Sequence, residues 1–114
     1  MRNEKRKNFR LEEPLSVVRC SMKYLLETHS LSRDISEDGI CLVTPHKVEI
    51  GEILELGIYI PEAKEPIRAT GEVVRRNQSD DPKYPYLLGI KFIKIAPQDS
   101  VRIREHIRFF LLKG

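Results

Sequence analysis

Apolar residues recur at every second position through most of this 114-residue chain, and that period restricts the fold to short β-strands. Between residues 54 and 60, leucine and isoleucine alternate with Glu55, Gly57 and Tyr59, which is the clearest strand pattern in the sequence. Comparable stretches predict strands over residues 18–22, 30–35, 40–43, 66–76 and 88–92. Roughly six short strands in about 80 residues, with turn signals between them, indicate an all-β or β-rich barrel or sandwich.

Two of these stretches carry further expectations about individual positions. In the first, Val18 and Cys20 alternate with Arg19 and Ser21, which predicts a half-buried strand. In the fifth, Gly71 falls inside the strand pattern, and a glycine there indicates a bend or a close approach by another segment.

The C-terminal part of the chain changes to the period of a helix, which we predict over residues 97–112. Pro97 suits the first helical position, and Asp99 lies beside the positive end of the helix dipole. One side of this helix carries the apolar residues Ile103, Ile107, Phe110 and Leu111. We expect this stripe to pack on the strands. Phe109 and Leu112 lie on other sides, and we favour their completing the packing over their forming a partner surface.

The composition is that of one soluble globular domain, with 40% hydrophobic and 32% charged residues. No apolar run approaches the roughly 18 residues that span a bilayer, and no apolar stretch follows the charged start as in a secretory signal. We therefore expect a cytoplasmic protein without membrane insertion. The G-x-S-x-G, phosphate-loop and dinucleotide glycine motifs are missing, so we expect no catalytic residues and no enzymatic activity.

The cysteines and histidines do not have the spacing of a metal site. Cys20 and Cys41 lie in alternating apolar segments without a C-x-x-C motif, so we interpret both as buried free thiols. His29, His46 and His106 are scattered along the sequence. The sequence therefore predicts neither a metal nor a cofactor.

The net charge of +3 is concentrated at the N-terminus. Residues 1–10 hold five basic residues and one acidic residue, whereas residues 11–114 hold 15 basic and 16 acidic residues. This asymmetry argues against a surface that binds a nucleic-acid polymer and favours capture of an anion near the N-terminus, although an unattached solvated tail has the same composition. We divide the chain into a flexible basic arm, residues 1–12, and a folded domain, residues 13–114.

Two short motifs stand out within this organisation. Arg6 and Arg10 form R-x-x-x-R in the basic arm, and residues 34–39 form D-x-S-x-x-G at the end of the second predicted strand. The second motif alone is also typical of an ordinary serine-stabilised turn. The same arginine spacing at Arg104 and Arg108 is interpreted as the solvated side of the predicted helix.

In this order and in a chain of this length, the two motifs resemble those of the PilZ domain family, bacterial receptors for the second messenger cyclic diguanylate (c-di-GMP). The similarity extends over nearly the whole chain, because residues 70–75 and 88–92 resemble later strands of the family. The resemblance implies a six-stranded antiparallel β-barrel followed by a C-terminal α-helix. It further implies that c-di-GMP is bound by Arg6, Arg10, Asp34, Ser36 and Gly39. Lys5 can contact a phosphate, help to hold a second stacked nucleotide, or point to solvent.

These residue types suit the implied ligand. The planar guanidinium of Arg6 or Arg10 can pair with phosphate oxygens or with guanine O6 and N7, and can stack on a base. The Asp34 carboxylate can accept hydrogen bonds from guanine N1–H and N2, and Ser36 offers a hydroxyl beside it. Gly39 permits either a positive φ or a close approach of backbone.

We expect a signal receptor whose arm orders when the ligand binds and thereby changes the surface offered to a downstream protein partner. One alternative is a small barrel that binds single-stranded nucleic acid, but such barrels use exposed aromatic residues, and this chain has no tryptophan and only eight phenylalanine and tyrosine residues. Another is a ligand-independent interaction module acting through the terminal helix. Arg33 and Arg75 are long enough to reach the site, but we favour their interpretation as surface charge.

Overall fold

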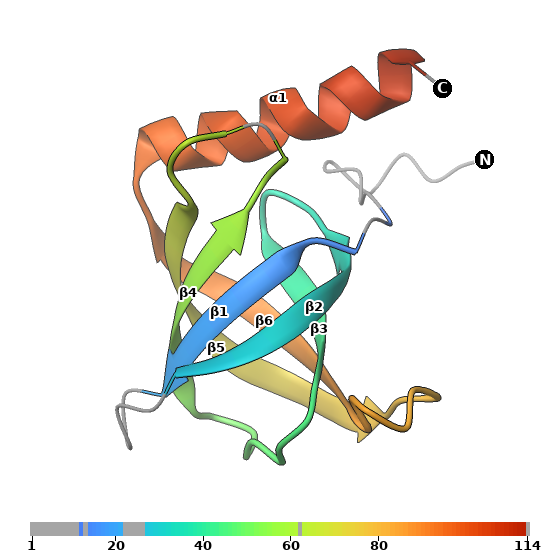
Figure 1. The fold of residues 1–114 in the computed structure, drawn as a ribbon. Coiled ribbons are helices and arrows are strands. Elements are labelled where there is room, and N and C mark those ends of the chain that lie inside the picture. Colours follow the sequence, from blue (N-terminus) through green and yellow to red (C-terminus); the bar gives the residue numbers. More distant parts are fainter. Residues whose placement is uncertain (1–11, 13, 22–26, 62, 114) are drawn as a thin grey trace, which may run out of the picture.

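The computed structural model describes residues 12, 14–21, 27–61 and 63–113, which form six β-strands and one α-helix (Figure 1). The elements are β1 (Ser16–Ser21), β2 (Glu27–Ile35), β3 (Gly39–Thr44), β4 (Ile53–Tyr59), β5 (Ile67–Gln78), β6 (Tyr86–Ile95) and α1 (Pro97–Lys113). Each predicted strand and the predicted helix are present. The basic arm lies outside the described residues, apart from Glu12.

The strands close into a barrel in the order β1-β2-β3-β6-β5-β4, and every neighbouring pair is antiparallel. The predicted six-stranded antiparallel barrel with a C-terminal helix is therefore confirmed. In β4, the apolar residues that predicted the strand are also the buried ones, since Leu54, Leu56 and Ile58 are at most 3% exposed. Closure leaves no unpaired strand edge in the described sheet, which removes a common route to aggregation.

Helix α1 lies across one end of the barrel, which we call the helix end (Figure 1). Its side chains Ile103 and Ile107 are buried and join the barrel core, as their spacing predicted. Phe110 is half-buried, but Phe109 is 56% exposed, so the expectation that Phe109 completes the packing is wrong. Leu112 lies where side chains are not described.

The start of α1 is joined to the hairpin between β4 and β5. Asp99 accepts hydrogen bonds from the backbone N–H of Arg68 at 3.3 Å and from Arg102 Nη1 at 3.0 Å. Arg102 also donates to the backbone carbonyls of Glu65 and Pro66. These contacts fix the direction in which the helix leaves β6, so that α1 crosses the barrel end.

Strand β1 is present, but its buried face differs from the apolar face of the sequence. Val17, Arg19 and Ser21 are buried, whereas Val18 and Cys20 are only half-buried. The pairing with β4 explains this orientation, because Val17, Arg19 and Ser21 stand opposite the inward-facing Ile58, Leu56 and Leu54. Residues directly opposite each other in an antiparallel pair lie on the same face of the sheet. The strongly apolar inward face of β4 therefore decides which face of β1 is buried.

The consequence is a polar cluster inside the barrel, at the end away from α1. The Arg19 side chain donates from Nε to Thr44 Oγ1 at 3.0 Å, and Ser30 Oγ donates to the same oxygen at 3.0 Å. Burial lowers the pKa of the Arg19 guanidinium, and the negative charge of Glu52 partly opposes that effect. Glu52 itself accepts from Ser21 Oγ at 3.3 Å.

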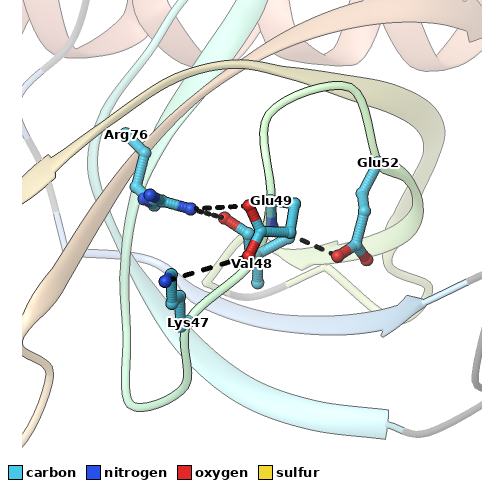
Figure 2. A network of polar contacts seen from close by, with 5 residues as sticks. All are labelled: Lys47, Val48, Glu49, Glu52 and Arg76. Carbon is cyan, nitrogen blue, oxygen red and sulfur yellow. Dashed lines mark hydrogen bonds and ion pairs between the residues drawn. The ribbon is translucent and has the colours of Figure 1, made fainter.

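The loop of residues 45–52 covers this end, which we call the loop end. Arg76 donates to the Val48 carbonyl and to Glu49 Oε1, both at 3.2 Å, and Lys47 lies 3.9 Å from Glu49 Oε2 (Figure 2). The Glu49 backbone N–H donates to Glu52 Oε2 at 3.1 Å. The charged groups of the loop end are thus directed at one another.

Two smaller sequence expectations concern Gly71 and the cysteines. A Cβ atom on Gly71 would lie 2.4 Å from Ile90 Cγ2, and the register shifts between Thr70 and Gly71, so the predicted close approach is confirmed. Both cysteines are free thiols, with Cys41 buried as expected and Cys20 only half-buried.

Candidate functional site

The D-x-S-x-x-G residues form the turn between β2 and β3, at the helix end of the barrel. The Ser36 N–H donates to the Gly39 carbonyl at 2.9 Å, and the Asp38 N–H donates to Ser36 Oγ at 3.2 Å. A serine hydroxyl that accepts from the backbone two residues later replaces part of the hydrogen bonding of a regular turn. Ser36, which is 1% exposed, therefore contributes to the turn itself.

Gly39 is required by the close approach of β6 rather than by its backbone angles. An ideal Cβ on Gly39 would lie 2.2 Å from the backbone oxygen of Ile90, inside any acceptable contact distance. The positive-φ glycine of the described chain is Gly51. The Phe92 N–H also donates to the Asp38 carbonyl at 2.9 Å, which joins the turn to β6 on the same side.

Asp34 is partly buried at the end of β2. The β2–β3 register shifts between Ser32 and Asp34, after which Asp34 pairs with Cys41 and Ile35 with Ile40. Because Ile35 and Ile40 face the core, this shift turns Asp34 and Cys41 together to the outside of the barrel. The bulge thus directs the carboxylate to the outer surface beside the turn.

A groove of about 410 Å³ opens beside this turn, a size common among small-molecule sites. It is lined by Glu37, Asp38, Gly39, Ile40, Cys41, Val74, Arg75, Gly89, Ile90, Lys91, Phe92 and Ile95. The charged groups that the described residues contribute to the lining are two carboxylates, on Glu37 and Asp38, and two cations, on Arg75 and Lys91. Apolar walls with a few charged groups can hold a ligand that has flat bases and an anionic backbone.

Arg75 is exposed, as expected for surface charge, and it also lines this groove. It pairs with Gly89 in the β5–β6 ladder, and a Cβ on Gly89 would lie 3.1 Å from the Arg75 atoms Cβ, Cζ and Nη2. The guanidinium therefore lies across the space left by the missing side chain. Its flat face is suited to stacking on a base or to contact with a phosphate.

Arg75, Lys91 and Cys41 were not among the predicted site residues. The signal that identifies them is the pairing of β3 and β5 with β6, which aligns Gly39 with Lys91 and Arg75 with Gly89. Long-range register of this kind is not contained in the local sequence pattern.

The predicted binding residues fall into two groups. Asp34, Ser36 and Gly39 come together at the β2–β3 turn, and Gly39 also lines the groove. The arm residues Lys5, Arg6 and Arg10 lie outside the described residues.

Helix α1 reaches the same turn through Arg104. Its Nε donates to Glu37 Oε2 at 3.1 Å, and its Nη2 donates to Glu37 Oε1 at 3.4 Å. The Arg104 side chain is 47% exposed and the Glu37 side chain 24% exposed. Arg104 was interpreted as part of the solvated side of the helix, but it forms a two-point ion pair with a residue of the groove.

The described residues offer little support for other kinds of site. Among them, no group of three or more His, Cys, Asp or Glu side chains is arranged to hold a metal ion. The helix that the structure describes is not long and apolar enough to cross a membrane.

A small antiparallel barrel capped by one helix, with a serine-stabilised acidic turn beside an outer groove, defines the class of this domain. The family model of the PilZ domain matches residues 4–111. This chain belongs to the PilZ domain family. The comparison with curated proteins gave no match.

Several solved structures share the barrel fold of this chain. The Bacillus subtilis inhibitor of motility (MotI/DgrA) is 28% identical with a TM-score of 0.78, over 99% of this chain and 55% of that one. The PilZ domain of Escherichia coli YcgR, solved with c-di-GMP, is 14% identical with a TM-score of 0.71, over 96% of this chain and 93% of that one. MrkH, described as a c-di-GMP-dependent transcription regulatory factor, is 16% identical with a TM-score of 0.74, over 96% of this chain and 52% of that one.

The similarities to YcgR and to MrkH, at 14% and 16% identity, show the fold alone. The chain spans about half the length of the inhibitor of motility and of MrkH, so it corresponds to one part of each of those proteins.

Proposed function

We propose that this domain is a receptor for c-di-GMP that binds the messenger at the β2–β3 turn and its groove. The observation that carries the proposal is the coincidence of three features: the D-x-S-x-x-G sequence, a turn built by its serine, and a charged groove against that turn. Membership of the PilZ family and the YcgR domain solved with c-di-GMP support it.

In this proposal the turn recognises a guanine base. Asp34 accepts hydrogen bonds from guanine N1–H and the N2 amine, as carboxylate side chains accept hydrogen bonds from base amino groups in protein–DNA complexes. Ser36, whose Oγ accepts from Asp38 N–H, is proposed to contact the ligand through its hydroxyl. Gly39 allows the base to approach the backbone of β3 and β6.

Arginines from the N-terminal arm are proposed to complete the site. Arg6 and Arg10 bind the phosphates or stack on the bases, and Lys5 is a further phosphate contact. Arg75, which lies over Gly89 in the groove, and Lys91 add positive charge on the opposite side of the ligand. The arm is proposed to become ordered when the ligand binds, because the two negative charges of the ligand neutralise the positive charge of the arm.

The ordered arm would change the surface of the helix end, and we propose that a downstream protein recognises this change. The inhibitor of motility and MrkH are neighbours of the same fold whose names refer to motility and to transcription. On this proposal the domain is a receptor and not an enzyme, it works in the cytoplasm, and c-di-GMP is its ligand and not a cofactor.

Titration calorimetry with c-di-GMP tests the proposal. The Arg10→Ala and Asp34→Ala variants should each weaken binding by about 100-fold or more, because each removes a charged hydrogen-bonding partner from the ligand. Two control variants each remove one charge outside the proposed site. Asp80→Ala removes a negative charge from the exposed loop between β5 and β6, and Arg33→Ala removes a positive charge from the exposed surface of β2. Both should leave the affinity for c-di-GMP unchanged. Unchanged affinity in both site variants would defeat the assignment of the site.

A further inference from the structure

The Glu37–Arg104 ion pair links the ligand-binding turn to helix α1. The Glu37 carboxylate lines the groove, and Arg104 of α1 donates to both of its oxygens, at 3.1 and 3.4 Å. We infer that Arg104 is a positioning residue of the proposed site, which holds and neutralises the Glu37 carboxylate so that the groove accepts an anionic nucleotide. This inference rests on the function proposed above.

The charge of the groove gives the first argument. Among the described residues of its lining, the charges of Glu37 and Asp38 balance those of Arg75 and Lys91, although the proposed ligand carries two negative charges. A carboxylate without a partner on this surface would repel the ligand. The two-point contact from Arg104 removes that repulsion, and it does so from the helix without occupying the groove, because Arg104 itself is not part of the lining.

The geometry of the turn gives the second argument. Glu37 lies between Ser36 and Asp38, whose hydroxyl and backbone N–H form the turn. The Asp38 carbonyl accepts from Phe92 N–H, so β6 holds the backbone of the turn while Arg104 holds the Glu37 side chain. A guanidinium fork fixes the direction of a carboxylate as well as its charge, which a single-point cation such as lysine does not.

The same contact couples the ligand to α1. If Arg104 favours the ligand-bound state, then binding of the ligand must favour the Arg104 contact by the same factor, since linkage is reciprocal. Occupation of the groove should therefore strengthen this contact between α1 and the turn.

Five proteins measured by calorimetry with c-di-GMP test the inference: wild type, Arg104→Ala, Arg104→Lys, Glu37→Gln and the double variant Arg104→Ala/Glu37→Gln. Arg104→Ala should weaken binding by about fivefold, the upper range for a partly exposed ion pair. Glu37→Gln should bind as well as wild type or better, and adding it to Arg104→Ala should restore the affinity, because the uncompensated carboxylate is gone. Arg104→Lys should show a partial loss.

Matched controls come from the same helix. Arg108 lies 3.9 Å from Glu105, both side chains are 60% exposed, and neither lines the groove. Arg108→Ala and Glu105→Gln change the net charge in the same way as the test variants, and neither should alter the affinity. The melting temperatures of Arg104→Ala and Arg108→Ala should agree within a few degrees, which excludes loss of folding as the cause.

The outcomes separate the two proposals. A loss with Arg104→Ala that Glu37→Gln reverses supports the inference. A loss that Glu37→Gln does not reverse, an equal loss with Arg108→Ala, or no loss at all overturns it while the proposed function stands. If the wild-type chain does not bind c-di-GMP, both fall.

Discussion

The two ends of the barrel each carry an arginine–carboxylate pair, but the pairs have different surroundings. At the loop end, Arg76 contacts Glu49 and the Val48 carbonyl within a covering loop (Figure 2). At the helix end, Arg104 contacts Glu37, which also lines the groove of about 410 Å³. The loop-end pair holds a loop in place, whereas the helix-end pair borders the groove beside the β2–β3 turn.

The comparison shows that an ion pair or a charged cluster does not by itself mark a binding site. The loop end has the more polar interior, with Arg19, Ser30 and Thr44 buried inside the barrel. Its polar groups point at one another, and this mutual satisfaction is what buried polar groups require. The helix end is distinguished instead by a serine-built turn, a backbone approach that needs glycine, and a concave surface.

The largest effect is expected from Gly39→Ala at the helix end. The added Cβ would lie 2.2 Å from the Ile90 backbone oxygen, so β3 and β6 must separate. We expect a loss of about 3 kcal/mol in the free energy of unfolding, the upper range for overpacking, together with loss of c-di-GMP binding. Chemical denaturation and calorimetry measure the two effects. Gly57→Ala, whose Cβ meets its nearest atoms at 3.9 Å, should leave both within error.

A smaller effect, confined to stability, is expected from Thr44→Val at the loop end. The change removes the oxygen that accepts from Arg19 Nε and Ser30 Oγ, and leaves two buried donors without that acceptor. We expect a loss of about 2 kcal/mol in the free energy of unfolding, with c-di-GMP affinity unchanged. Adding Arg19→Met should recover part of the stability, because the buried charge is then absent. A change in affinity with Thr44→Val would break the distinction between the two ends.

The smallest effect is expected from Arg76→Ala. Glu49, its partner, is 65% exposed, and exposed ion pairs contribute at most about 1 kcal/mol. We therefore expect a loss below about 1 kcal/mol in the free energy of unfolding, decreasing further at high salt. The affinity for c-di-GMP should not change. A binding defect comparable to that of Arg104→Ala would show that the two ion pairs are not functionally different.

The sequence predicted the elements of the fold because their signals are local. Leu54, Leu56 and Ile58 alternate strongly enough to define β4, and the stripe of Ile103 and Ile107 defines the buried side of α1. The D-x-S-x-x-G turn was found at its place after β2 for the same reason, since turn formation depends on a few neighbouring residues.

Features that depend on strand pairing were missed. The buried face of β1 is set by its partner β4, so that Arg19 rather than Cys20 points inward. Arg75 enters the groove because it is aligned with Gly89 across β5 and β6, and Arg104 meets Glu37 because the helix crosses above the turn. Contacts between residues 67 positions apart have no signature in a local pattern.

The central claim is that c-di-GMP occupies the groove beside the β2–β3 turn, and an NMR titration of the wild-type chain tests it most directly. The account predicts that the largest amide shifts fall at residues 34–41 and 89–92, while residues 45–52 of the loop end remain unchanged. Absence of saturable shifts, or shifts concentrated in residues 45–52, would contradict it.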